Sequence, residues 1–328
     1  MRRIRIGVLR ALQVGDMLCA VPALRSLRRG FPEACITLFG LPWAERFVAR
    51  FGHYLDAFVP VPGFPGLVEQ RPDDAAAAQF LHRMRAQRFD LVIQMHGNGT
   101  VTNGIVAQMG ARRIAGFSDG ELNSRARFMR YPENGHEIRR LVNLARFLGA
   151  PHAGEHLEFP LCADDEEELE CVPLLRSLKK GRYLCLHAGA RDPAKRWPIR
   201  QFARLADALA EEFRFTVVLT GSVEERPITA AIRAAMRSSA IDAAAPISLG
   251  ALAALVGHAR LLVTNDTSVS HIAAALRVPS VVIFRASEID RWAPLDRHLH
   301  ASVWDPAGTQ GPQVLTQCRA KLRGGAPA

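Results

Sequence analysis

Residues 262–276, LVTNDTSVSHIAAAL, constrain the fold of this chain more than any other stretch. The apolar residues up to Val263 are typical of a buried strand, the polar residues 265–268 of a turn, and the small residues from Ile272 of a closely packed helix. A second apolar run, 281–284, predicts another strand. Strand, helix and strand in this order form the repeating unit of a parallel sheet.

The turn after the first of these strands is a candidate ligand site. In open parallel sheets, ligands bind in the crevice beyond the carboxyl ends of the strands. The helix that follows offers free N–H groups and a partial positive charge, which suit a phosphate. Taken alone, an Asp-Thr-Ser turn is more often a simple helix cap, so the rest of the chain has to decide between these interpretations.

The same alternation of strands and helices runs through the whole chain. Further strands are expected at 4–9, 36–39, 89–94, 112–117, 183–187 and 215–220. Residues 150–170 interrupt the pattern with turn-like and acidic stretches, as at a domain boundary. We therefore predict an α/β protein with two Rossmann-like domains, 1–155 and 156–328, whose parallel sheets face a central cleft. A last helix is expected at 314–322, and it could pack back on the first domain.

The composition favours a globular protein that stays in the cytoplasm. Of the 328 residues, 48% are hydrophobic, which is enough for a sizeable core, and no apolar run is long enough to span a bilayer. The N-terminal residues enter a strand without the apolar core of a signal peptide. The six cysteines form no Cys-x-x-Cys pair, so neither a zinc site nor a disulfide framework is predicted.

The formal net charge of +10 predicts an anionic partner. A nucleic acid is not expected, because no zinc-finger, helix-turn-helix or RNP-type aromatic pattern accompanies the charge. Arginine-rich residues lie between 125 and 140, and the helix predicted over 136–147 should expose Arg139 and Arg140. We expect this segment to meet an anionic or membrane-associated partner, with peripheral contact at the inner membrane surface.

Asp16 follows Gly15 at the start of a predicted helix that ends near Arg29. The helix dipole favours a negative charge at that position. The carboxylate can be a simple helix cap, or it can be a base at the binding edge of the sheet. The preceding loop has neither a Gly-x-Gly-x-x-Gly pattern nor a P-loop, which argues against a standard dinucleotide site there.

Four short motifs stand out along the chain. They are GDMLCAVPAL at 15–24, HAGA at 187–190 followed by KRWP at 195–198, GSVEE at 221–225, and TNDTSVSHIAAA at 264–275. Each motif is weak alone, but four in this order are specific. Over residues 4–294 the chain resembles glycosyltransferase family 9, the ADP-heptose:lipopolysaccharide heptosyltransferases.

This resemblance implies a GT-B fold and an inverting glycosyl transfer that needs neither a metal ion nor a cofactor. The first domain would bind the acceptor and supply the catalytic base, Asp16, which takes the proton from the acceptor hydroxyl as its oxygen attacks the anomeric carbon. The second domain would bind the nucleotide-sugar donor, expected to be an ADP-sugar that carries a heptose. The acceptor would be an anionic glycan or a lipid-linked saccharide of the lipopolysaccharide type.

The resemblance also implies donor-binding roles in the second domain. Lys195 and Arg196, with the amides that open the helix after Asp266, would stabilise the charge of the leaving diphosphate. Asp266 would bond hydroxyls of the sugar, and either Glu224 or Glu225 would bond the ribose. The full set is Gly189, Lys195, Arg196, Glu224, Glu225, Asp266, Thr267, Ser268 and His271.

Some of these residues also have purely structural interpretations. Lys195 and Arg196 can be a solvated pair, and His271 can be a core histidine bonded to a carbonyl. Trp197 is interpreted as a packing residue. Candidate residues on the acceptor side are His96, Asn98, Arg125, Arg127 and Arg139.

Two residues depart from the family pattern. Ser268 stands where glycine is usual, and Arg285 follows a late strand where a small residue is expected. Both bear on the identity of the sugar more than on the type of reaction. Two other functions stay open: a nucleotide-sugar epimerase or hydrolase, which would act on the donor alone, and a degenerate module that only binds a nucleotide or a glycan.

Overall fold

The computed structural model describes residues 2–120 and 127–324, and the chain divides into two compact units, Met1–Glu155 and His156–Ala328. Each unit contains one six-stranded sheet in which all neighbouring strands are parallel. Both units are therefore Rossmann-like, and the predicted α/β class is confirmed. In the described part of the chain, no helix combines the length and apolar character needed to cross a membrane.

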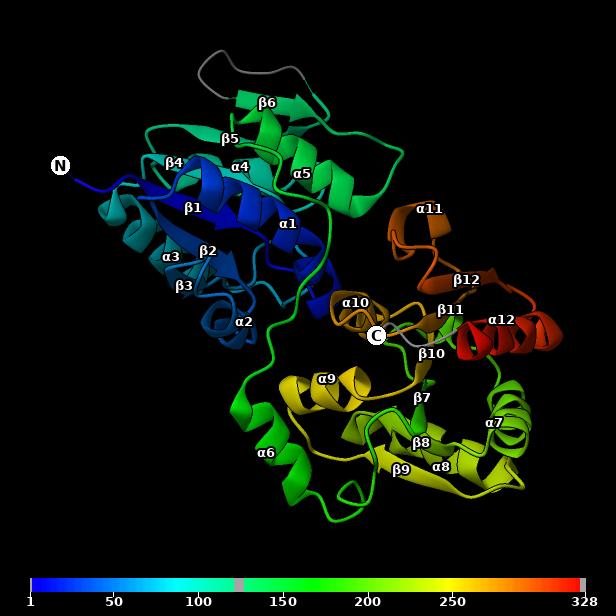
Figure 1. Cartoon of the computed structure of the whole chain (residues 1–328). Coiled ribbons are helices and arrows are strands. Elements are labelled where there is room, and N and C mark those ends of the chain that lie inside the picture. The colour runs from blue at the N-terminus through cyan, green and yellow to red at the C-terminus, as the bar shows by residue number, and fades with distance from the viewer. Residues whose placement is uncertain (1, 121–126, 325–328) are drawn as a thin grey trace. The chain divides into compact units, whose positions relative to one another are not determined.

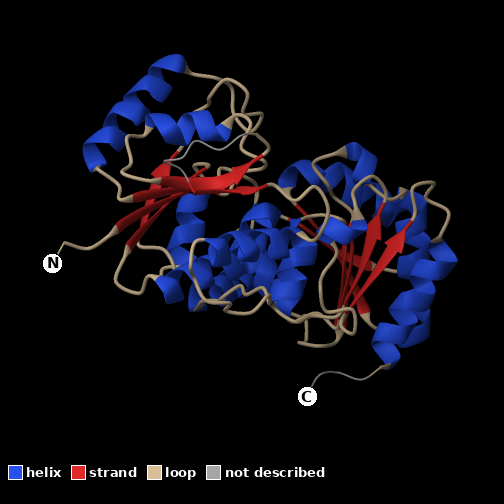
Figure 2. Cartoon of the chain, turned by 90° about the horizontal axis from the view of Figure 1, so that it is seen from above, coloured by secondary structure: helices blue, strands red, loops and turns tan. Residues whose placement is uncertain are grey.

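The sheet of the first unit has the order β3-β2-β1-β4-β5-β6. Its strands are β1 (Arg5–Leu9), β2 (Cys35–Gly40), β3 (Ala57–Pro60), β4 (Leu91–Gln94), β5 (Ile114–Ser118) and β6 (Arg127–Arg130). Its helices are α1 (Val14–Gly30), α2 (Ala44–Arg50), α3 (Asp74–Gln87), α4 (Thr102–Gln108) and α5 (Glu137–Phe147). Helices lie on both faces of the sheet (Figure 2), and α1 packs against α5 (Figure 1).

The sheet of the second unit has the order β12-β11-β10-β7-β8-β9. Its strands are β7 (Tyr183–His187), β8 (Thr216–Gly221), β9 (Ala240–Ala244), β10 (Leu261–Asn265), β11 (Ser280–Phe284) and β12 (His300–Trp304). Its helices are α6 (Ala163–Cys171), α7 (Ile199–Phe213), α8 (Arg226–Ala235), α9 (Leu249–Gly257), α10 (Ser268–Ala275), α11 (Ile289–Trp292) and α12 (Gly311–Arg323), with single 3-10 turns η1 (Pro193–Lys195) and η2 (Val223–Glu225). The last helix, which the sequence allowed to pack on the first domain, contacts α7 and strands β10 to β12 of its own unit.

Alternating side chains of the central strands fill two cores in the second unit. Leu184 and Leu186 of β7 point to the face covered by α7, α8 and α12, whereas Cys185 points to the face covered by α6, α9 and α10. All five residues of β7, β10 and β11 are buried. Burial on both faces explains why these strands are continuous apolar runs and why the sequence pattern identified them.

The edge strands differ from what the sequence indicated. The strands expected from the sequence did not include residues 127–130, but Arg127–Arg130 form β6 and pair with β5. The two arginines of this strand are exposed and its two central residues are half-buried, so it carries little apolar signal. β12, which ends at Trp304 and forms an edge of the other sheet, was also absent from the strands expected from the sequence.

Stability should fall in mild acid because of a buried histidine at the start of β12. Burial lowers the pKa of His300 to about 4, and its Nδ1 lies 2.8 Å from the hydroxyl of Ser280. Below pH 6.5 the unfolded chain therefore binds a proton that the folded chain excludes until about pH 4. We expect the free energy of unfolding to fall over this window by up to ~1.4 kcal/mol per pH unit for each such histidine.

Urea unfolding at several pH values between 7 and 4 measures this slope. His300→Gln should make it shallower, whereas His298→Gln, at an exposed position in the preceding loop, should leave it unchanged. Equal slopes in wild-type protein and His300→Gln would contradict the assignment.

Candidate active site

Asp16 lies in the first turn of α1, directly beyond the carboxyl end of β1. The helix begins two residues before it, and its N-cap is Gln13, so Asp16 is not the capping residue. The side chain is half-buried, and it sits where the helix dipole favours a negative charge. Of the two interpretations left open by the sequence, this position does not fit a simple cap.

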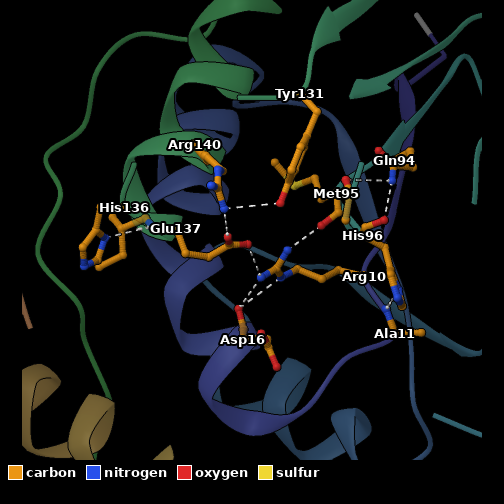
Figure 3. Close-up of polar contacts among 12 residues, drawn as sticks. Arg10, Ala11, Asp16, Gln94, Met95, His96, Tyr131, His136, Glu137 and Arg140 are labelled. Atoms are coloured by element: carbon orange, nitrogen blue, oxygen red, sulfur yellow. Dashed lines mark hydrogen bonds and ion pairs between the residues drawn. The ribbon is translucent and has the colours of Figure 1, made fainter. Parts of the chain in front are cut away.

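A buried arginine holds the backbone of Asp16 in place. Nε and Nη2 of Arg10 donate to the backbone carbonyl oxygen of Asp16 at 3.0 and 2.8 Å, and Nη1 donates to the carbonyl oxygen of Met95. Arg10 thus ties the end of β1 to the first turn of α1 and to the residue after β4 (Figure 3). The sequence interpretation gave Arg10 no role. A cation directly after an apolar strand was the available signal.

Glu137 and Arg140 extend this contact to α5. Glu137 accepts from Nη2 of Arg10 at 3.3 Å and from Nη1 of Arg140 at 3.0 Å (Figure 3). Arg140 also donates to the carbonyl oxygen of Glu133 at 2.6 Å, and its guanidinium lies 4.9 Å from the centre of the Tyr131 ring. The prediction that Arg140 is exposed was wrong, because the side chain pairs inside the unit and is only 3% exposed.

His96 supports the same loop from β4. Its Nδ1 accepts from the backbone N–H of Ala11 at 3.3 Å, and its Nε2 lies 3.8 Å from Oε1 of Glu69. Burial, and then the positive charge of Arg10, lower the pKa of His96 to about 4, so the ring is neutral at pH 7. Asn98 closes the following turn by accepting from the N–H and hydroxyl of Thr100.

Of the other acceptor-side candidates, Arg127 and Arg139 contact residues other than Asp16. Arg125 lies outside the described residues. Arg127 is the first residue of β6, so it lies at the amino ends of the parallel strands, whereas Asp16 lies beyond their carboxyl ends. The guanidinium of Arg127 stacks over the ring of Phe147. Arg139 is exposed on α5 and pairs with Glu155 at 3.0 Å.

In the second unit, Lys195 and Asp266 form an ion pair. Asp266 follows the carboxyl end of β10 and is buried, and Nζ of Lys195 lies 2.8 Å from its Oδ2. Ser287 donates its hydroxyl to the same oxygen. His271, one turn into α10, is also buried, which lowers the pKa of its ring, while the charge of Asp266 acts in the opposite direction. The structure thus brings together residues from two separate motifs.

The loop that carries Lys195 is held by side chains that the sequence interpretation missed. Asn265 accepts from the backbone N–H of Trp197 at 2.9 Å and donates to the carbonyl oxygen of Ala188 at 2.8 Å. Asp305 accepts from the indole N–H of Trp197 at 2.7 Å. Trp197 is buried edge-on against Phe202, in agreement with its interpretation as a packing residue. An Asn beside the Asp of the motif was the available signal.

Glu225 lies directly against the backbone of Gly189. A Cβ atom placed on Gly189 would lie 2.0 Å from Oε1 of Glu225, so only glycine leaves room for this carboxylate. Oε2 of Glu225 accepts from the backbone N–H of Ser222 at 2.9 Å, which orients the side chain. Glu224, in contrast, is exposed. Of the two glutamates, Glu225 is the one that lies at the carboxyl ends of β7 and β8.

A comparison with protein-family models decides the family. The model described as glycosyltransferase family 9 (heptosyltransferase) matches residues 77–322. The chain belongs to glycosyltransferase family 9. It is therefore a glycosyltransferase, as the order of the motifs predicted, and this decides against an epimerase or a hydrolase.

Curated and solved proteins agree with this membership. This chain is 26% identical over 303 residues to lipopolysaccharide heptosyltransferase 2 of Salmonella typhimurium. The aligned region covers 86% of this chain and 83% of the relative. A family 9 glycosyl transferase from Veillonella parvula has a TM-score of 0.83 at 20% identity, with 99% of both chains covered. The E. coli heptosyltransferase WaaC, solved with ADP, has a TM-score of 0.73 at 17% identity and covers 97% of this chain and 100% of its own. These likenesses confirm the GT-B type of fold.

The two departures from the family 9 pattern have different structural consequences. Ser268 is the first residue of α10, and Thr267 is the N-cap of that helix. The carbonyl oxygen of Thr267 accepts a hydrogen bond from the hydroxyl of Ser270 at 2.7 Å. Arg285 donates to the carbonyl oxygens of Arg196 and Pro306 and so joins two loops. Arg285 therefore has a structural explanation.

The side chain of Arg196 is also used within a loop, because its Nε donates to the carbonyl oxygen of Ala190 at 2.9 Å. Across residues 2–120 and 127–324, there is no group of three or more His, Cys, Asp or Glu residues that could hold a metal ion.

Proposed function

We propose that this glycosyltransferase moves a heptose from ADP-heptose to a hydroxyl group of a lipopolysaccharide-type acceptor. The relatives and the ADP complex of a solved family member support the choice of donor and acceptor class. The observation that carries the proposal is the Lys195–Asp266 pair beside the start of α10. It places a cation, a carboxylate and helix N–H groups together at the end of one strand.

The second unit is the proposed donor site. Lys195 and the N–H groups of Thr267 and Ser268 would stabilise the diphosphate as it leaves, because cations and helix N-termini favour negative charge. Asp266 would accept hydrogen bonds from heptose hydroxyls, with His271 behind it. Glu225, rather than the exposed Glu224, would accept from the ribose hydroxyls.

The first unit is the proposed acceptor site, with Asp16 as the general base. Its carboxylate would take the proton of the acceptor hydroxyl while that oxygen forms a bond to the anomeric carbon. The bond from this carbon to the diphosphate breaks on the opposite face, so the configuration inverts. The protein's own cation and amides carry the leaving-group charge, and we therefore propose that no metal ion is required.

We place the reaction at the cytoplasmic surface of the inner membrane. A net charge of +10 supports peripheral binding to an anionic surface, where a lipid-linked acceptor would be found. A nucleic acid partner has no further support beyond the charge.

The donor preference can be tested by calorimetric titration with ADP, UDP and GDP in the presence of EDTA. Binding of ADP with clear preference over the other two is expected. Preference for UDP or GDP would keep the glycosyltransferase but reject an ADP-sugar, and binding that needs added Mg²⁺ would reject metal independence.

Gly189→Ala should weaken ADP binding without any loss of a donor-binding side chain. The added Cβ would displace the Glu225 carboxylate, so we expect a loss of about tenfold, close to that of Glu225→Gln, as for a hydrogen bond to a charged group. Gly104→Ala is the matched control, because that glycine lies in α4 with open space around it. Calorimetry with ADP would contradict the role of Glu225 if both Gly189→Ala and Glu225→Gln bound like wild-type protein.

A further inference from the structure

Three charged side chains are buried together in the first unit. Arg10, Glu137 and Arg140 are only 1%, 6% and 3% exposed. Removing charges from water costs more than their mutual attraction usually returns, so a buried ion triad is weak evidence for a contribution to stability. The triad therefore calls for a functional explanation.

The contacts of Arg10 show what the triad holds. All three nitrogens of its guanidinium are engaged, with Asp16, Met95 and Glu137 as acceptors. The two backbone acceptors belong to the first turn of α1 and to the residue after β4. A planar guanidinium offers donors in a fixed fork, so it sets the relative position of these two segments.

Glu137 and Arg140 fix Arg10 in turn. Glu137 is the first residue of α5, where the helix dipole favours its negative charge, and its two oxygens bridge Arg10 and Arg140. Arg140 is anchored by the carbonyl oxygen of Glu133 and by Tyr131. A continuous set of contacts therefore runs from α5 to the backbone of Asp16, as Figure 3 shows.

We propose that Arg10 is a positioning residue for the catalytic base Asp16, and that Glu137 and Arg140 hold Arg10 in the required orientation. This inference rests on the proposed function of Asp16. The triad does not touch the acceptor in this role. It acts through the backbone carbonyl of Asp16, and it sets where the carboxylate stands relative to the acceptor hydroxyl.

Small displacements of a reacting group have large effects, since a shift of ~1 Å can lower a rate by ~100-fold. Arg10→Lys keeps the buried positive charge but cannot bond both backbone carbonyls and Glu137 in the same fork. We expect it to lower kcat at least about tenfold, while the KM for ADP-heptose and the affinity for ADP stay within about twofold of wild type. Glu137→Gln should give the same pattern.

The assay uses ADP-heptose with heptose-deficient lipopolysaccharide as acceptor, and ADP titration of the same preparations. Arg146→Gln, an exposed position on the same helix α5, should match wild-type protein in every readout. Circular dichroism on heating gives the folded fraction of each variant. If Glu137→Gln does not fold, Arg10→Lys still tests the proposal, because it keeps a positive charge beside Glu137 and leaves the Glu137–Arg140 pair intact.

Asp16→Asn, measured in parallel, separates the possible failures. If Asp16→Asn is inactive but Arg10→Lys and a folded Glu137→Gln keep wild-type kcat, the positioning role is overturned and the function of Asp16 stands. A fall in thermal stability with unchanged kcat per folded molecule would also overturn it, because that is the result of a purely structural triad. If Asp16→Asn itself turns over normally, both inferences fail.

Discussion

Asp16→Asn is expected to lower kcat by a factor of about 10² to 10⁴, which is the usual contribution of a general base. The substitution keeps the shape of the side chain in the first turn of α1 and removes its ability to take a proton. Affinity for ADP should be unchanged, because the proposed donor residues all lie in the other unit. Steady-state kinetics with ADP-heptose and calorimetry with ADP measure the two effects separately.

A matched control is available in the same unit. Asp74 also lies in the first turn of a helix, α3, and is exposed. Asp74→Asn should therefore show wild-type kcat and ADP affinity. Near wild-type turnover in Asp16→Asn would mean that another group takes the proton from the acceptor.

Lys195→Ala is expected to weaken ADP binding by roughly 10- to 100-fold, in the range of a lost hydrogen bond between charged groups. Two effects act together. The cation that would face the diphosphate is lost, and the buried carboxylate of Asp266 loses the ammonium group that lies 2.8 Å from it. An unpaired carboxylate at that position would also repel the diphosphate.

The control for Lys195 is Lys180→Ala, which removes a lysine that is 71% exposed and pairs weakly with Glu166 at 3.7 Å. Its ADP affinity should equal that of wild-type protein. Titration at two salt concentrations guards against a general effect of net charge, since long-range attraction is screened by salt. Unchanged affinity in Lys195→Ala would place the diphosphate elsewhere.

The central strands and the turns after them were predictable from the sequence. β7 and β10 are buried on both faces, so each is a continuous apolar run that ends in polar residues. This is why Asp266 could be placed at a strand end before the structure was known. The short edge strand β6, with exposed arginines at both ends, has no such pattern.

Side-chain pairing across elements could not be predicted. Arg140 differs from its exposed neighbour Arg139 because it packs against Tyr131 and pairs with Glu137, which in turn pairs with Arg10 from another part of the chain. Asn265 and Asp305 hold the Lys195 loop through partners that are 68 and 108 residues away in the chain. Local patterns do not encode contacts of that separation.

The most direct test of the proposed function is to incubate the enzyme with ADP-heptose and heptose-deficient lipopolysaccharide in the presence of EDTA. Mass spectrometry of the acceptor and NMR of the new linkage measure the outcome. One added heptose per acceptor, with inverted anomeric configuration and loss of the product in Asp16→Asn, is the expected result. Release of free heptose without a change in the acceptor, or a product with retained configuration, would contradict it.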